Sequence, residues 1–172
     1  MHPLDKFACC PVCGGRHFVN HDEKSRRCAY CGFVYYLNPS AATVAFITDD
    51  RGRLLVERRG REPAKGTLDL PGGFADIGET LEEAVAREVK EETGLHVTTV
   101  QYLFSYPNHY LFSGFSVPTL DAFFRCEVQN VNMLKAADDA ADCFFLSLDS
   151  LKIEDFGLAS IRHGLQRFLE RR

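Results

Sequence analysis

The 172-residue sequence lacks long apolar runs, low-complexity linkers and an excess of basic residues. No stretch near its amino terminus is typical of a signal peptide, and no apolar run is long enough to span a bilayer. We therefore expect a cytoplasmic protein without a membrane segment. The formal net charge of −4 and the pI near 5.9 make binding to nucleic acid over a wide surface unfavourable.

The sequence also has no internal repeat beyond two short cysteine motifs. With 45% hydrophobic residues, its length suffices for one full core and one small additional module. An Asn38-Pro39 dipeptide marks a turn after the amino-terminal region. We predict a small domain over residues 1–37 and a larger one over residues 38–172.

Four of the seven cysteines form two Cys-x-x-Cys-Gly motifs, Cys10 with Cys13 and Cys28 with Cys31, separated by fourteen residues. Four thiolates with this spacing can surround one Zn²⁺ tetrahedrally, and the pattern resembles a zinc ribbon. The alternative of two unrelated disulfides requires an oxidising compartment. A redox motif normally occurs once, within a βαβ pattern that is absent here. Zinc could replace the core that this polar segment lacks.

The remaining cysteines do not fit either motif. Cys9 has the wrong spacing to Cys13 and is predicted to be a spare thiol. Cys126 and Cys143 lie in apolar stretches that are typical of strands, and we expect them to be buried as small hydrophobic side chains.

Glycine and proline are absent between Glu79 and Glu92, where apolar residues recur at helical intervals. This predicts an amphipathic helix that ends at Gly94. At about 100° per residue, Glu88, Glu91 and Glu92 share one arc of the helix. Three neighbouring carboxylates repel one another, and hard oxygen ligands of this kind suit Mg²⁺ or Mn²⁺.

A Pro71-Gly72-Gly73 loop precedes this helix and follows a short strand-like segment at residues 68–70. Glutamate-rich helices are usually solvated and stabilised by pairs such as Glu83 with Arg87. That interpretation leaves the loop unexplained. Glycines allow the backbone to approach a ligand closely, so the loop and the helix together favour a metal and ligand site.

The segment from Gly73 to Leu95 follows the pattern G-x5-E-x7-R-E-U-x-E-E-x-G-U, where U is aliphatic. At every position it resembles the Nudix box. Nudix hydrolases use water to cleave a nucleoside diphosphate linked to another group. The resemblance implies a role for each matching residue. Glu91, Glu92 and the Gly72 carbonyl would be metal ligands, and Glu88 would be a metal-linked carboxylate and the base. Glu79 and Arg87 would form an ion pair that fixes the loop to the helix.

The family commonly adds one acidic ligand after the box. Its spacing favours Asp139, with Asp138 close behind; Asp142 is a further candidate and Glu127 the runner-up. The three aspartates can equally well be solvated loop residues. Upstream, Arg58 or Arg59 can present a fork of donors to phosphate oxygens. Arg51 and Arg61 fit better as surface residues.

A zinc ribbon directly before a Nudix domain resembles the NADH pyrophosphatase group. That group carries S-Q-P-W-P-F-P-x-S after the box, where this chain has residues 105–113, SYPNHYLFS. Both serines, the first proline and the sixth-position aromatic are kept, whereas the Gln, Trp and later prolines are not. This implies NADH, ADP-ribose or a related dinucleotide as substrate. Tyr106, Asn108 and Tyr110 are candidate base contacts in a loop, and Phe104 and Phe115 fit better in the core.

The order of elements implies an α/β/α sandwich with a mixed sheet, which is the Nudix fold. We expect strands at residues 43–48, 53–57, 97–104 and 119–128 and a final helix at residues 157–171. A competing hypothesis is a regulator that senses a nucleotide and uses the ribbon to contact a partner or nucleic acid. The intact carboxylates favour the enzyme. The resemblance is also compatible with a homodimer.

Overall fold

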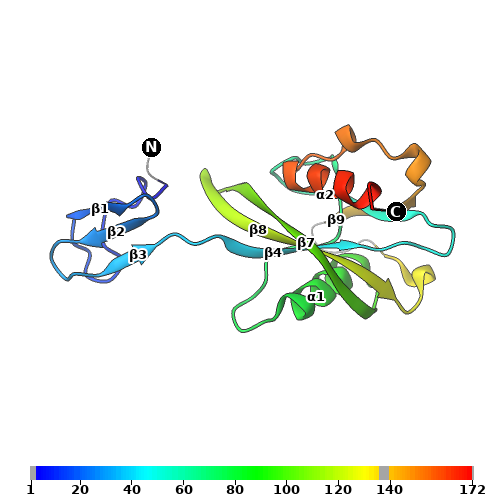
Figure 1. Ribbon diagram of the computed structural model, residues 1–172, viewed down its shortest axis with the longest axis horizontal. Coiled ribbons are helices and arrows are strands. Elements are labelled where there is room, and N and C mark those ends of the chain that lie inside the picture. Colours follow the sequence, from blue (N-terminus) through cyan, green and yellow to red (C-terminus); the bar gives the residue numbers. More distant parts are fainter. Residues whose placement is uncertain (1–2, 136–139, 172) are drawn as a thin grey trace. The chain divides into compact units, whose positions relative to one another are not determined.

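The computed structural model describes residues 3–135 and 140–171, which form two compact units. One unit extends to Pro39 and the second begins at Ser40, two residues after the boundary that the Asn-Pro turn predicts (Figure 1). Within the described ranges, no helix is both long and apolar enough to cross a membrane.

The first unit is a three-stranded antiparallel sheet with strands in chain order. It contains β1 (Phe18–Asp22), β2 (Ser25–Cys28) and β3 (Val34–Tyr36). Its buried cluster holds Phe18 and two cysteines, with Phe33 and Tyr35 packed against them. So few apolar side chains provide little hydrophobic stabilisation for a unit of this size.

The second unit contains two three-stranded sheets with the orders β4-β8-β7 and β6-β5-β9. The pair β4 and β8 is parallel, and the other pairs are antiparallel. The strands are β4 (Ser40–Phe46), β5 (Leu54–Arg59), β6 (Leu68–Asp69), β7 (Val97–Phe112), β8 (Phe115–Val128) and β9 (Ala140–Leu146). The helices are α1 (Leu81–Thr93) and α2 (Ala159–Leu169), with short 3₁₀ turns at Val131–Met133, Leu148–Ser150 and Ile153–Asp155.

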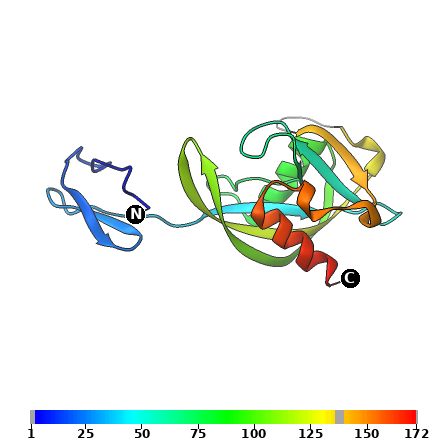
Figure 2. The same cartoon turned by 90° about the horizontal axis from the view of Figure 1, so that it is seen from above.

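The helices α1 and α2 cover opposite faces of these strands (Figures 1 and 2). Alternate residues of each strand enter separate apolar clusters: Phe123 packs with α2, whereas Ala122 and Phe124 pack with α1. This period of two is what a strand buried on both faces requires. The expected α/β/α sandwich with a mixed sheet is therefore confirmed.

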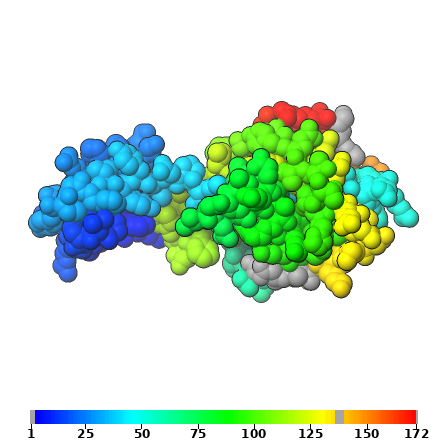
Figure 3. Space-filling model, turned by 90° about the horizontal axis from the view of Figure 1, so that it is seen from below, coloured from blue at the N-terminus to red at the C-terminus, as the bar shows by residue number. Residues whose placement is uncertain are grey.

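Helix α1 begins later than the sequence pattern predicts. Thr80 is its N-cap and forms a capping box with Glu83, so Glu79 precedes the helix. At the other end Gly94 adopts φ 70°, a left-handed conformation that suits glycine. The outer side of the helix, with Glu82 and Lys90, is exposed (green in Figure 3). The caps fix both ends of the helix, and its inner face provides carboxylates.

The segment 105–113, which the sequence suggested as a loop, is mostly strand. Strand β7 continues to Phe112 and pairs with β8 down to Phe115. Pro107 is tolerated because β7 lies at the edge of its sheet. On one face of β8, Ala122, Phe124 and Cys126 are buried, whereas Leu120 is exposed. The hairpin therefore places its side chains by strand alternation.

Candidate functional site

The first candidate site is the group of four cysteines in the amino-terminal unit. Their sulfur atoms all lie within 4.8 Å of one another. Cys10 Sγ is 3.7 Å from Cys31 Sγ, and Cys13 Sγ is 3.5 Å from Cys28 Sγ. Tetrahedral zinc with Zn–S bonds of about 2.3 Å places its sulfurs about 3.8 Å apart. None of the seven cysteines, all of which lie in the described ranges, forms a disulfide, and the separations fit a metal site.

Backbone groups favour thiolate at one cysteine of this cluster. The N–H groups of Cys31 and Tyr30 lower the pKa of Cys28 to about 6. Despite a backbone hydrogen bond from Gly15, the neighbouring thiols of Cys31 and Cys28 raise the pKa of Cys13 to about 12. Because thiolate is the form that binds metal, it is the arrangement of the four sulfurs that points to a metal centre.

The second candidate site is a cavity of about 490 Å³ in the larger unit. It lies between the end of α1, the glycine loop and the β7–β8 hairpin. Of the residues singled out in the sequence, the cavity is lined by Arg59, Gly72, Arg87, Glu88, Glu91, Glu92, Asn108 and Tyr110. The structure thus brings together residues that are up to 51 positions apart in the chain.

Arg87 holds the acidic groups of α1 in place. Its guanidinium contacts Glu79 at 2.9 and 3.0 Å, which is the ion pair expected from the sequence. It also contacts Glu88 at 2.9 Å and Glu91 at 3.0 Å, and donates to the Phe74 carbonyl at 3.0 Å. The hydrogen bond from Arg87 lowers the pKa of Glu79. One arginine therefore links the loop to the helix and orients two carboxylates.

The glycine loop is tied to β4 and to α1 at the same point. The carbonyls of Pro71 and Gly73 accept from Ala45 and Thr43 at 2.8 Å, and the Gly72 N–H donates to Glu92 at 2.9 Å. In the described structure, none of the bonds between this loop and β4 uses the Gly72 carbonyl. Gly72 has φ 149°, and a Cβ there would lie 2.1 Å from the Thr43 carbonyl oxygen. Only glycine fits at this position.

Gly73 provides a test of this arrangement. A Cβ at Gly73 would lie 2.5 Å from Glu88 Oε1, so Gly73→Ala is expected to displace that carboxylate. Because the resemblance to the Nudix box implies that Glu88 is the base, we expect kcat to fall about 10²-fold, since small misplacements of reacting groups are that costly. The atoms displaced belong to a side chain, so Tm should change little. Gly72→Ala is the contrasting variant, since its Cβ meets backbone and should lower Tm. Unchanged kinetics in Gly73→Ala would contradict the placement of Glu88.

Three buried carboxylates in this cavity were not singled out as site residues in the sequence. Glu57, Asp69 and Asp121 are 4%, 4% and 5% exposed and line the cavity together with Glu92, which is 6% exposed. Burial, and then the charge of Glu57, raise the pKa of Glu92 well above its usual value. Glu57 is recognisable in retrospect, because it lies two residues after the buried Leu55 and so shares its face of β5.

The two predicted arginines differ in position. Arg59 is bound by Asp69, by the Pro63 carbonyl at 2.7 Å and by the Tyr110 hydroxyl at 3.3 Å. Arg58 does not line the main cavity and donates to the Gly66 carbonyl at 2.8 Å. Arg61 is exposed, as the sequence predicted, and it also lines the cavity.

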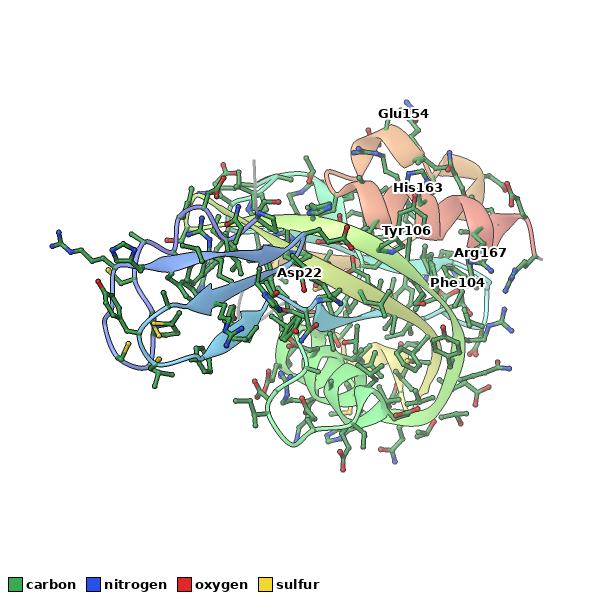
Figure 4. All side chains as sticks on the ribbon, turned by 60° about the vertical axis from the view of Figure 1, so that its left-hand side comes forward. Asp22, Phe104, Tyr106, Glu154, His163 and Arg167 are labelled. Carbon is green, nitrogen blue, oxygen red and sulfur yellow. The ribbon has the colours of Figure 1, made fainter. Side chains whose placement is uncertain are left out.

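Two of the three predicted base contacts line the cavity and the third does not. Asn108 and Tyr110 line the cavity, and Phe74 packs edge-on against Tyr110 with ring centroids 5.7 Å apart. Tyr106 lies outside the lining and stacks on His163 at 4.6 Å (Figure 4). Residues 108 and 110 share one face of β7 in the direction of the cavity, whereas Tyr106 is covered by α2.

None of the proposed downstream acids can be placed in the cavity. Asp139 and Asp138 lie outside the described residues. Asp142 is exposed on β9, where it pairs in register with Arg58. Glu127 is exposed and accepts a hydrogen bond from Thr99 at 3.1 Å. Neither Asp142 nor Glu127 lines the cavity.

The chain is similar in sequence to known nucleotide hydrolases. An NAD-capped RNA hydrolase NudC from Vibrio atlanticus is 35% identical over 106 residues, covering 62% of this chain and 39% of that protein. An ADP-ribose pyrophosphatase from Methanocaldococcus jannaschii is 37% identical over 123 residues, covering 67% of this chain and 66% of that protein. The match spans about two fifths of the length of the Vibrio NudC relatives and 56% of the NudC from Pseudomonas aeruginosa.

A solved NUDIX hydrolase from Nitrosomonas europaea has the same fold. It superposes with a TM-score of 0.74 at 23% identity, covering 95% of this chain and 91% of that one. The sequence model of the NUDIX domain matches residues 38–168, which include the glycine loop, α1 and the whole cavity lining. The chain therefore belongs to the NUDIX family.

Proposed function

We propose that this protein is a divalent-metal-dependent pyrophosphohydrolase that splits NADH, ADP-ribose or a related dinucleotide into two monophosphates. The observation that carries the proposal is the composition of one cavity. Carboxylates of α1 and the Gly72–Gly73 loop form one wall, and aromatic side chains of the hairpin line the same space. Relatives named for NAD-capped RNA and for ADP-ribose support a nucleotide diphosphate linked to a second group.

The residues of the cavity fit a divalent cation. Glu57 and Glu92 are buried carboxylates whose mutual repulsion needs a counter-charge. Oxygen donors of this kind match Mg²⁺ or Mn²⁺. We propose that the Gly72 carbonyl, Glu88, Glu91 and Glu92 hold the cation. When bound, the cation neutralises charge on the pyrophosphate and lowers the pKa of a bound water.

The protein's own residues perform the remaining steps. Glu88, held by Arg87, accepts the proton of the attacking water. The water oxygen forms a bond to one phosphorus, the bridging P–O bond breaks, and the bridging oxygen leaves with the second phosphate. Arg61 lines the cavity and can donate to phosphate oxygens, whereas Arg59 positions Asp69. Phe74 and Tyr110 offer aromatic surfaces for a base.

The proposal is tested with a substrate panel and product identification. Purified protein with Mg²⁺ or Mn²⁺ is incubated with NADH, ADP-ribose and a nucleoside triphosphate, and products are separated by chromatography. We expect NADH or ADP-ribose to be split into two monophosphates, and we expect the rate to depend on the added metal. Saturable binding of every compound without turnover would contradict the enzyme and favour a nucleotide-sensing regulator.

For the cysteine cluster, we propose one structural Zn²⁺ held by Cys10, Cys13, Cys28 and Cys31. The sulfur separations support this proposal, and the small apolar cluster of the unit supports a structural role.

A further inference from the structure

The side chain of Ser160 is buried without a hydrogen-bond partner. It is 1% exposed, and among the described residues its Oγ has no partner. It lies in the first turn of α2 and lines the main cavity together with its neighbours Leu158 and Ile161. An unpaired buried hydroxyl costs about 1–3 kcal/mol. A ligand that pairs with Ser160 would remove this cost.

Asp121 lines the same cavity as Ser160. Helix α2 runs alongside β8 in the same direction. A Cβ at Gly164 would lie 2.2 Å from the Phe123 ring, and further along both elements Arg125 lies over the Phe168 ring. Going back from that contact, Ser160 is one helical turn before Gly164, a rise of about 5.4 Å, and Asp121 is two residues before Phe123, a strand length of about 6.6 Å. The two side chains therefore face the same part of the cavity.

The Asp121 carboxylate is fixed in one orientation by its neighbours. Oδ1 accepts from the Thr119 hydroxyl at 2.6 Å, and Oδ2 accepts from Asn108 Nδ2 at 3.1 Å. Each carboxylate oxygen has two lone pairs, so both oxygens can accept a further hydrogen bond from a ligand. Because residues 108, 119 and 121 belong to one hairpin, the acceptor is rigidly placed.

The same part of the cavity disfavours anions. Asp69 is buried nearby, and burial raises its pKa despite its pairing with Arg59, with the charge of Asp121 adding to the effect. Arg59 offsets one of the two negative charges. A phosphate or carboxylate placed here would face the remaining charge of Asp121. The occupant must therefore be neutral or cationic and must donate hydrogen bonds.

Aromatic side chains adjoin this acceptor. Tyr110 lies two residues after Asn108 on the same face of β7, and it packs against Phe74. Phe112 also lines the cavity. A flat ring resting against this wall can direct a polar edge toward Asp121 and Ser160.

We propose that Asp121 and Ser160 recognise an amino group and an adjacent acceptor on the edge of an aromatic ring of the substrate. The amino group donates a hydrogen bond to the Asp121 carboxylate, and the adjacent acceptor accepts a hydrogen bond from the Ser160 hydroxyl. This inference rests on the proposed function, since it names a specificity-determining pair within that cavity. Two parts of a dinucleotide carry this chemistry: the carboxamide of nicotinamide and the amino–imine edge of adenine.

Substrate analogues distinguish the two sources. Binding of NAD, nicotinic acid adenine dinucleotide and nicotinamide hypoxanthine dinucleotide is measured by calorimetry with Ca²⁺ in place of Mg²⁺. We expect one deaminated analogue to bind about 10²-fold more weakly, because losing a buried charged hydrogen bond costs that much. That analogue identifies the ring. Asp121→Asn should reduce the difference to about twofold, because an amide can donate where the carboxylate only accepts.

Ser160→Ala keeps the proposal testable even if Asp121→Asn does not fold. It removes a hydroxyl that has no partner, so Tm should not fall, while KM for the preferred dinucleotide should rise about tenfold at nearly constant kcat. Matched controls are Asp149→Asn and Ser116→Ala, which are exposed and outside the cavity lining. Both should leave affinity unchanged.

Equal affinity of the wild-type protein for all three dinucleotides would overturn the inference. It would also be overturned if Asp121→Asn still bound one deaminated analogue about 10²-fold more weakly than NAD, or if KM were unchanged in Ser160→Ala. Calorimetry does not depend on turnover. Discrimination in binding with no hydrolysis in Mg²⁺ would therefore support this recognition and refute the enzymatic proposal.

Discussion

Glu92→Gln is expected to lower kcat about 10²–10³-fold, as does the loss of a single preorganised group in other active sites. Glu92 is 6% exposed and lies beside Glu57, so its charge is stabilised by the cation that it is proposed to bind. Glutamine keeps an oxygen that can accept from the Gly72 N–H. The change therefore removes charge while preserving the tie between loop and helix.

The same substitution should stabilise the metal-free protein. In the absence of a cation, the charge of Glu92 is buried against like charge, so removing it should raise the free energy of unfolding, and each unit of pKa elevation corresponds to about 1.4 kcal/mol. For a protein of this size each kcal/mol corresponds to about 2–4 °C in Tm. Mg²⁺ should raise the Tm of the wild-type protein and have little effect on the variant, which a thermal melt with and without Mg²⁺ measures.

Glu82→Gln is the matched control, because Glu82 lies on the same helix but is exposed and outside the cavity. It should retain both turnover and the Mg²⁺-dependent rise in Tm. If Glu92→Gln kept wild-type turnover, or if it lowered Tm in the absence of metal, Glu92 would not be a buried ligand whose charge needs a cation.

Local patterns predicted much of this structure because they report interactions close in sequence. Helical spacing identified α1. The sequence offered Glu83 as the i to i+4 partner of Arg87, whereas in the structure Arg87 pairs with Glu91 and Glu83 closes the capping box with Thr80. The position of Gly94 identified the end of the helix. Spacing also grouped the four cysteines, since two tight turns bring each pair together before any tertiary contact forms.

The buried acids of the cavity wall opposite α1 depended on tertiary pairing and were missed, although Asn108 and Tyr110 on the same wall were predicted. Asp121 is a polar residue in a strand, and its face of β8 is covered by α2. Asp69 is acceptable inside because Arg59 reaches it from the neighbouring strand. The β7–β8 register decided that Asn108 faces the cavity. Thr119 lies two residues from Asp121, but the other partner, Asn108, comes from β7, so the sequence around Asp121 does not reveal the full set of contacts.

Cys28→Ser is expected to abolish zinc binding and to unfold the amino-terminal unit while the larger unit stays folded. Structural zinc contributes about 10–16 kcal/mol in small modules at neutral pH. The apolar cluster of this unit contains Cys10, Phe18 and Cys28, so two of its three buried members are proposed ligands. Burial of the remaining side chains cannot replace a contribution of that size.

Metal analysis of the purified, reduced protein should find about one zinc per wild-type chain, following the four-thiolate rule, and almost none in Cys28→Ser. Hydrogen exchange should then show loss of protection in β1 to β3 and wild-type protection in α1 and β8, because the two units have separate cores. Cys9→Ser is the matched control, since Cys9 is exposed and outside the cluster. If Cys28→Ser retained a full equivalent of zinc, or if the wild-type ribbon stayed protected after its metal was chelated, folding of this unit would not depend on the four thiolates.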